Sequence, residues 1–194
     1  MNNKIILASK SEVRKKILKS HHIVCEVIPS NIDEDQVKES LIKEGASPGL
    51  VSKNLAELKA NKISIQNPDE LVLGADSVID LNNELISKPT NREEAIAILN
   101  KLNGKKHQLI SSVCISKKGS MVWNFTGVAT LTMKQLSLYD IKKYLAKIKD
   151  KELYAYGVYQ IEAGGRFLFS KIEGDKDTIM GLPIKQIKDY LQIK

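Results

Sequence analysis

The sequence predicts an α/β protein in which helices flank a mixed central β-sheet. Short apolar runs typical of buried strands alternate with amphipathic helical patterns along the chain. Two long strand patterns, residues 107–116 and 121–133, are joined by the short turn KKGS, and such a hairpin requires antiparallel pairing. The chain has 194 residues, and we expect a single domain over residues 1–194.

Most of the predicted elements have a local reason in the sequence. A capping residue precedes three helical patterns, at Ser11, Ser47 and Asn91. Glycine ends the helical patterns over residues 32–45 and 91–104, at Gly45 and Gly104. We expect strands at residues 4–9, 23–30, 71–80, 84–89, 107–116, 121–133 and 166–174, and helices at residues 12–21, 32–45, 48–64, 91–104, 137–149 and 182–194. Irregular structure is expected between residues 150 and 165.

The formal net charge of +7 is compatible with nucleic acid, a membrane surface or an acidic substrate such as a nucleotide. The lysines are spread along amphipathic patterns such as DIKKYLAKIKDK, as on solvated helix faces. We therefore expect no nucleic-acid partner. No apolar run reaches the length of a membrane span, so we expect no membrane partner either. The residues before the first helical pattern are too few for a secretory signal, which favours a cytoplasmic protein.

Cysteine and histidine usage argues against zinc and covalent catalysis. Cys25 and Cys114 lie in apolar, strand-like contexts, which favours buried free thiols. The three histidines have no zinc-ligand spacing with a cysteine, and no Ser-His-Asp arrangement stands out.

The segment LASKSEVR, residues 7–14, predicts an anion-binding site. A strand delivers Ser9, a tight turn follows, and Ser11 begins a helix whose free N–H groups, together with Arg14, can bind phosphate. The glycines and the lysine of a Walker loop are missing. Serines also cap helices that bind no ligand, and for this segment alone that alternative stays open.

Two acidic segments are candidates for the chemistry. The acids of IDED, residues 32–35, either complement a helix dipole or bind Mg²⁺, which takes carboxylate oxygens together with phosphate. Asp76 interrupts an apolar strand and needs a partner or a cleft, because an unpaired buried carboxylate is costly. It could bind Mg²⁺ or accept a proton from an attacking water, with Lys88 offsetting phosphate charge. An Asp76–Lys88 ion pair is the purely structural alternative.

Glu162 is a candidate for recognition of a base. It lies among apolar residues just before Gly164 and Gly165, which let a ligand come close or simply shape a turn. A carboxylate only accepts hydrogen bonds. It therefore suits a partner with two adjacent N–H donors, such as the Watson–Crick edge of guanine.

Together these segments resemble the Maf family of nucleoside triphosphate pyrophosphatases. The motifs that carry the resemblance run in order over nearly the whole chain. They are LASKSEVR at residues 7–14, the acid pair Asp33-Glu34, LAELKA at residues 55–60, GADSV at residues 74–78, Lys88-Pro89, the segment from Glu94 to His107, and EGD, Thr178 and GLP at residues 173–183.

The resemblance implies two lobes with a cleft between them, a homodimer, and hydrolysis of a nucleoside triphosphate between its α- and β-phosphates. It also implies a divalent cation, Mg²⁺ or else Mn²⁺ or Co²⁺. Asp76 would be the general base or the acid that organises metal and water, and Glu34 would assist it with the metal. The positions matched to triphosphate binding are Ser9, Arg14, Lys59 and Lys88.

Three positions bear on the choice of base. The branch acting on dTTP and UTP has arginine, threonine and glutamine where this chain has Val13, Ser77 and Glu162. Glutamate at the last position resembles the branch acting on 7-methyl-GTP, although that branch usually has GSDQ in place of GADS. The resemblance thus favours a plain or modified purine triphosphate, 7-methyl-GTP first, over dTTP or UTP.

Two other classes of function compete with an enzyme. One is a non-catalytic nucleotide-binding regulator, for instance of septum formation, but the charged motif positions are intact. The other is a nucleic-acid binder, but only 5% of the residues are aromatic, and most of the Tyr and Phe residues cluster between Tyr144 and Phe169. No aromatic stacking platform is therefore expected.

Overall fold

A computed structural model describes residues 4–161 and 164–193. Its centre is a seven-stranded sheet in the order β2-β1-β3-β5-β6-β7, with β4 beside β3. β1 (Ile5–Leu7) lies parallel to β2 (Cys25–Val27) and to β3 (Val72–Leu81), whereas the other pairs are antiparallel. This mixed sheet with its flanking helices confirms the predicted fold class. The remaining strands are β4 (Glu84–Ile86), β5 (Lys106–Lys117), β6 (Ser120–Met133) and β7 (Phe169–Glu173).

The helices begin largely where the sequence predicts. Side chains of Ser11, Ser47 and Asn91 accept hydrogen bonds from backbone N–H groups and cap the first turns of α1, α3 and α4. The helices are α1 (Glu12–Ser20), α2 (Glu34–Lys43), α3 (Pro48–Gln66), α4 (Arg92–Leu102), α5 (Leu138–Leu145), α6 (Asp150–Tyr156), α7 (Lys176–Ile179) and α8 (Ile184–Leu191), with a 3₁₀ turn, η2, at Gly165–Leu168. None of the helices in the described ranges is both long and apolar enough to cross a membrane.

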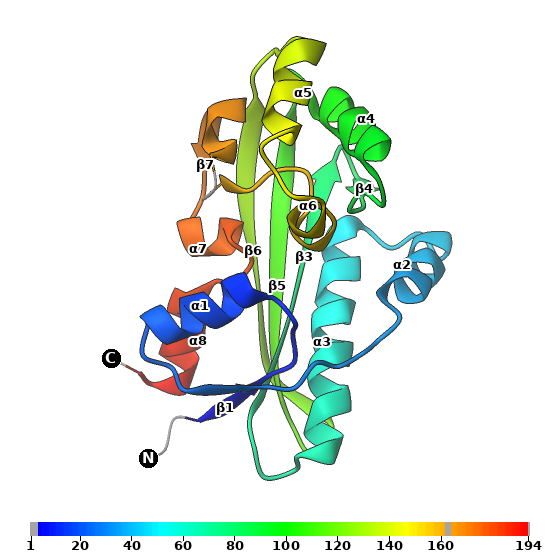
Figure 1. Cartoon of the computed structure of the whole chain (residues 1–194). Coiled ribbons are helices and arrows are strands. Elements are labelled where there is room, and N and C mark those ends of the chain that lie inside the picture. Colours follow the sequence, from blue (N-terminus) through cyan, green and yellow to red (C-terminus); the bar gives the residue numbers. More distant parts are fainter. Residues whose placement is uncertain (1–3, 162–163, 194) are drawn as a thin grey trace.

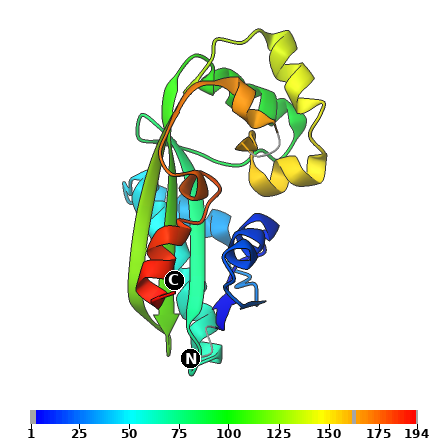
Figure 2. The ribbon, with the colours of Figure 1, turned by 90° about the vertical axis from the view of Figure 1, so that its left-hand side faces the viewer.

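The long strands β3, β5 and β6 run through two lobes (Figure 1). In one lobe, α1 and α8 pack on the sheet around Leu18, Leu73, Ile115 and Ile187. In the other, α4, α5 and α6 build a separate apolar cluster. Figure 2 shows this second lobe projecting on the same side as α1, with the long strands on the left of the view.

Helix α3 packs very closely on the opposite face of the sheet. A Cβ atom at Gly74 of β3 would lie 2.1 Å from the carbonyl oxygen of Ala56 and 2.8 Å from the backbone nitrogen of Ala60, both in α3. Only glycine permits this approach. Helix and strand therefore form one rigid unit, and this unit carries two of the charged side chains discussed below.

The structure differs from the sequence prediction near residue 150. The predicted helix over residues 137–149 ends at Leu145, and α6 lies where irregular structure was expected. The guanidinium of Arg92, on α4, donates to the carbonyls of Leu145 and Ile148 at 2.9 and 2.7 Å. The carbonyl of Leu145, the last residue of α5, also accepts a hydrogen bond from the N–H of Ile148 at 3.0 Å. A side chain far away in sequence therefore adds two hydrogen bonds at and just after the end of α5.

His107 is a buried titratable side chain outside the cleft described below. It is 2% exposed, and its Nε2 lies 3.1 Å from the hydroxyl of Tyr159. Burial lowers the pKa of His107 to about 4 from the ordinary 6.5. The folded protein therefore holds this imidazole neutral where the unfolded chain would already protonate it.

We expect the free energy of unfolding to fall as the pH drops from 6.5 to about 4, by up to about 3 kcal/mol from His107. In this window the unfolded chain binds the proton and the folded chain does not, so protonation favours unfolding. Urea titrations over this range measure the effect. His107→Gln should flatten the slope, whereas His22→Gln should retain it; an unchanged slope in His107→Gln would contradict the assignment.

Candidate active site

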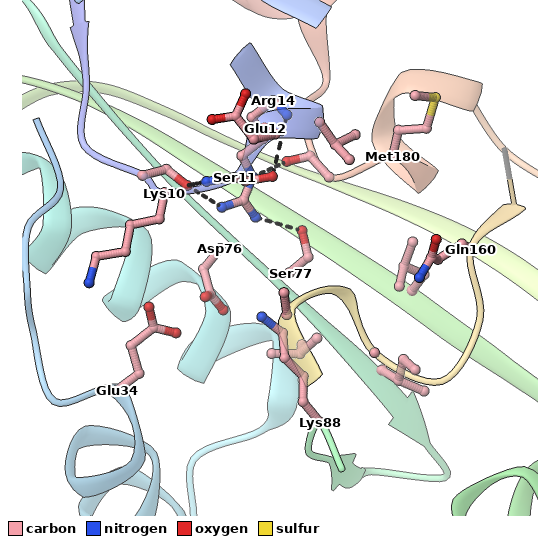
Figure 3. Close-up of a pocket in the computed structure, with 18 of the residues that line it drawn as sticks. Lys10, Ser11, Glu12, Arg14, Glu34, Asp76, Ser77, Lys88, Gln160 and Met180 are labelled. Atoms are coloured by element: carbon pink, nitrogen blue, oxygen red, sulfur yellow. Dashed lines mark hydrogen bonds between the residues drawn. The ribbon is translucent and has the colours of Figure 1, made fainter. Parts of the chain in front are cut away.

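A cleft of about 660 Å³ lies between the two lobes. The turn after β1 and the start of α1 line it on one side, and residues from α6 through Ile161 line it on another, with the middle of β3 between them. Figure 3 shows Glu34, Asp76 and Lys88 in one part of this cleft and Gln160 and Met180 in another. A volume of this size is typical of small-molecule sites.

An interruption in strand pairing creates the cleft. β1 pairs with β3 only as far as Leu73, and β4 begins to pair with the same edge at Ile79. In the described part of the sheet, the edge of β3 between these points has no strand beside it. β1 ends at Leu7, opposite Leu73, and runs parallel to β3, so Ser9, two residues further along, comes beside Ala75. Two motifs far apart in sequence thus meet at one break in the sheet.

Asp76 and Glu34 share the ammonium group of Lys59. Nζ of Lys59 lies 2.9 Å from Oδ1 of Asp76 and 2.8 Å from Oε1 of Glu34. Asp76 is 5% exposed and Lys59 4% exposed, so both charges are largely removed from water. The side chain of Ser52 also donates to the backbone carbonyl of Asp76 at 3.2 Å. Helix α3 therefore holds Asp76 at two points: Lys59 binds its carboxylate, and Ser52 binds its backbone carbonyl.

The partner of Asp76 differs from the structural alternative considered for the sequence. That alternative paired Asp76 with Lys88, whereas the ion pair is formed by Lys59. Within the described residues, Lys88 forms no hydrogen bond or ion pair, and its side chain faces the cleft. Desolvation and then the nearby charge of Arg14 lower the pKa of Lys88, while Glu34 and Asp76 oppose the shift. Lys88 is therefore a cation available to an anionic ligand.

Glu34 stands at the first turn of α2, where Asp33 caps the helix. Burial disfavours its charged form, but the charge of Lys59 and its hydrogen bond outweigh that effect and lower the pKa of Glu34. None of the residues of α2 is buried. The ion pair with Lys59 is consequently a main anchor for this carboxylate.

The chemistry of these donors fits a divalent cation that arrives with phosphate. Among the described residues, no group of three or more His, Cys, Asp or Glu side chains is placed to hold a metal alone. Mg²⁺, however, commonly binds through one or two carboxylates together with substrate phosphates. Oδ2 of Asp76 is buried and has no hydrogen-bond partner in the described structure. Asp76 and Glu34 can therefore contribute oxygen ligands to such a cation.

Arg14 is held almost entirely by the protein. Its guanidinium donates to the carbonyls of Gly181 and Ala75, both at 2.9 Å, and to the hydroxyls of Ser9 and Ser77, both at 3.1 Å. Burial lowers the pKa of Arg14, and the charges of Asp76 and Glu34 oppose the shift. With four donors engaged, Arg14 keeps one N–H group and its charge for a ligand.

The hydroxyl of Ser77 is part of a directed hydrogen-bond chain. Ser111 lies opposite Ser77 on β5, and their oxygens are 2.9 Å apart. Ser111 donates its proton to the carbonyl of Thr178 at 2.8 Å, so Ser77 must donate to Ser111 while it accepts from Arg14. Ser77 therefore has no proton left for a base, and in this structure it positions Arg14.

The C-terminal motif completes this network. Asp175 caps α7 by accepting hydrogen bonds from the backbone and hydroxyl of Thr178 at 2.8 and 3.0 Å. Helix α7 lies so close to β6 that a Cβ atom at Gly127 would come within 2.8 Å of Thr178. The motif thus supplies two carbonyls to the network, from Thr178 and Gly181, and so helps to orient Arg14.

The structure brings most of the predicted site residues together. Ser9, Val13, Arg14, Glu34, Lys59, Asp76, Ser77 and Lys88 all line the cleft. Glu162 lies outside the described residues. Ser52, Ser111 and Gln160 were not expected from the sequence; the first two carry no motif signal, whereas Gln160 stands two residues before Glu162 in the same segment.

Comparison with solved structures concerns the fold alone. A HAM1 protein from Coxiella burnetii superposes with a TM-score of 0.55 at 12% identity, covering 98% of this chain and 99% of its own. The Ham1 protein of Staphylococcus aureus gives a TM-score of 0.53 at 16% identity, covering 97% and 98%. The arrangement of sheet and helices therefore occurs in other proteins of very different sequence.

Sequence comparison is far more specific. A Pelagibacter ubique protein named nucleoside triphosphate pyrophosphatase is 65% identical over 193 residues, which cover 100% of this chain and 99% of that protein. A Brucella abortus protein named 7-methyl-GTP pyrophosphatase is 39% identical, covering 95% of this chain and 92% of its own. Residues 4–193 match the family model described as Maf-like protein. The chain therefore belongs to the Maf family.

Proposed function

We propose that this chain hydrolyses a nucleoside triphosphate between the α- and β-phosphates, releasing a nucleoside monophosphate and pyrophosphate. The observation that carries the proposal is the carboxylate of Asp76 in the cleft wall. Lys59 holds its Oδ1, while Oδ2 has no partner among the described residues. The printed name of the Pelagibacter ubique relative supports the same reaction.

In the proposed reaction, a water molecule attacks the α-phosphorus and loses its proton to Asp76. The bond between the α-phosphorus and the bridging oxygen breaks, and pyrophosphate leaves with the bond electrons. Lys88 and Arg14 stabilise the charge that develops on the phosphates. Ser9 accepts hydrogen bonds from Ser11 and Arg14, so its own proton is available to a phosphate oxygen. Lys59 orients the two carboxylates. We further propose that its ammonium group contacts the triphosphate directly.

Glu34 and Asp76 are the residues that would hold a divalent cation, with Mg²⁺ proposed first and Mn²⁺ or Co²⁺ as alternatives. When bound, the cation would neutralise phosphate charge. The support is the pair of carboxylates on one cleft wall and the unpartnered oxygen of Asp76.

We propose 7-methyl-GTP as the first substrate to consider, ahead of other purine triphosphates. The support is the glutamate at position 162, together with the Brucella abortus relative named 7-methyl-GTP pyrophosphatase. Val13 replaces the arginine of the branch acting on dTTP and UTP and lines the cleft. Hydrolysis of dTTP and UTP is the second candidate, since Thr and Ser at position 77 differ little.

One substrate panel tests both the reaction and the base. The panel contains 7-methyl-GTP, GTP, dTTP and UTP, each assayed with Mg²⁺, Mn²⁺ or Co²⁺. We expect pyrophosphate and a nucleoside monophosphate as products, with the highest kcat/KM for 7-methyl-GTP. Release of orthophosphate alone would contradict the reaction. A clear preference for dTTP and UTP would contradict the assignment of Glu162, and Glu162→Gln should then leave the ranking unchanged.

We also propose a homodimer, which rests on the family resemblance, and a cytoplasmic location, as expected from the sequence. Sedimentation at several concentrations measures the first. A non-catalytic regulator of septum formation would bind nucleotide and release no pyrophosphate in the same panel.

A further inference from the structure

The cleft continues away from Asp76 into a second hollow. This hollow, of about 480 Å³, lies between residues of α1 and α6. It shares with the main cleft the residues Glu12, Val13, Lys151, Ala155, Gln160 and Met180. Val13, Ala155 and Met180 are apolar, Glu12 and Lys151 carry opposite charges, and none of the charged residues around Asp76 is among them. A ligand with its phosphates near Asp76 would therefore extend its less charged end toward this region.

Gln160 is the unusual side chain of this region. It is 8% exposed, and the Nε2 atom of its amide is buried with no hydrogen-bond partner in the described structure. A buried amide donor without a partner costs free energy. Gln186 also has an unpartnered amide atom, but it does not line the cleft. Among the described residues that line the cleft, Asp76 and Gln160 each have one buried side-chain atom without a hydrogen-bond partner.

The backbone fixes the position of Gln160 on both sides. Its N–H donates to the hydroxyl of Tyr144 at 3.2 Å, and its carbonyl accepts from the N–H of Gly165 at 2.8 Å. A Cβ atom at Gly165 would lie 2.5 Å from that carbonyl oxygen, so glycine is required for this contact. The backbone of Gln160, a residue that lines the cleft, is thus held on a rigid support, as expected of a preorganised binding group.

We propose that Gln160 is a specificity-determining residue whose amide donates a hydrogen bond to a ring carbonyl of the base. The proposal rests on the proposed function, because it takes a nucleoside triphosphate as the ligand. The apolar side chains of Val13 and Met180 suit the faces of a flat ring, and the amide suits its polar edge. Both 6-oxopurines and 4-oxopyrimidines carry such a carbonyl, and neither adenine nor cytosine carries it at that position.

Binding measured without hydrolysis tests the role of Gln160. The probes are α,β-methylene analogues of GTP and of 2-aminopurine riboside triphosphate, which lacks the 6-carbonyl. A second pair is the analogue of UTP and of pyrimidin-2-one riboside triphosphate, which lacks the 4-carbonyl. Calorimetry in Mg²⁺ compares the wild type, Gln160→Leu, and the control Gln108→Leu, which changes an exposed glutamine of β5 outside the cleft.

We expect Gln160→Leu to weaken binding of the carbonyl-bearing analogue about tenfold and to leave its partner analogue within about twofold. Its melting temperature should be unchanged or higher, since an unpartnered buried amide is removed; a merely structural role would lower it. Gln108→Leu should match the wild type. Equal weakening of both analogues, no weakening, or no nucleotide binding by the wild type would overturn the inference.

Hydrolysis separates this inference from the proposed function. If the analogues bind with the expected pattern but the wild type releases no pyrophosphate from GTP, UTP or 7-methyl-GTP, the proposed reaction fails and the role of Gln160 stands. If pyrophosphate is released and Gln160→Leu binds both members of each pair like the wild type, the inference fails and the reaction stands.

Discussion

Replacing Asp76 by asparagine is expected to lower kcat about a thousandfold with little change in KM. The carboxamide has almost the same shape but cannot take up the proton of the attacking water, and general-base catalysis typically contributes factors of 10² to 10⁴. Because the lost interaction arises in the transition state, kcat and kcat/KM should fall together. Steady-state release of pyrophosphate from the best nucleotide of the panel measures both constants.

The variant must be shown to fold, because Asp76 is paired with the buried ammonium of Lys59. Glu34 retains its own contact with that ammonium, so we expect Asp76→Asn to melt cooperatively, although at a lower temperature. The double variant Asp76→Asn/Lys59→Met also removes the buried ammonium, which Asp76→Asn leaves with Glu34 as its remaining ion-pair partner. It should recover stability without recovering activity; full activity in Asp76→Asn, or its return in the double variant, would contradict the role of Asp76.

Replacing Lys59 by methionine is expected to lower the free energy of unfolding by about 3–5 kcal/mol. Methionine keeps most of the length of the side chain, but it leaves the Asp76 carboxylate, 5% exposed, without its countercharge. Removing one partner of a buried ion pair costs this much because the other charge stays buried and uncompensated. Urea denaturation at pH 7 measures the loss.

A matched control separates burial from charge. Lys43 pairs with Glu39 at 2.7 Å on the exposed surface of α2, and Lys43→Met should change stability by well under 1 kcal/mol. In a double-mutant cycle, Lys59→Met and Asp76→Asn should show a large coupling energy, because each variant leaves the charge that the other removes. Additive effects would mean that the ion pair contributes little.

The fold and the position of the site could be predicted from local features. Capping residues such as Ser47 and Asn91 set helix starts, and the apolar run around Asp76 set the central strand. The Asn82–Asn83 pair has positive φ at both residues, as a tight hairpin turn requires. These features act within a few residues, so they can be read without the rest of the chain.

What could not be predicted depends on contacts between distant segments. The guanidinium of Arg14 meets the carbonyl of Gly181, 167 positions along the chain. From the sequence we expected Arg14 to hold a phosphate, but nothing in its neighbours indicated that most of its donors would be used by the protein. The same holds for Arg92, whose guanidinium donates to the carbonyl of Leu145, 53 positions along the chain, at the end of α5.

The two acids that share Lys59 differ in mechanical support. Asp76 belongs to a strand that touches α3 at Gly74 with no room for a methyl group, whereas Glu34 belongs to a helix without a buried side chain. An anionic ligand that competes for Lys59 would therefore displace the carboxylate of Glu34 more easily than that of Asp76.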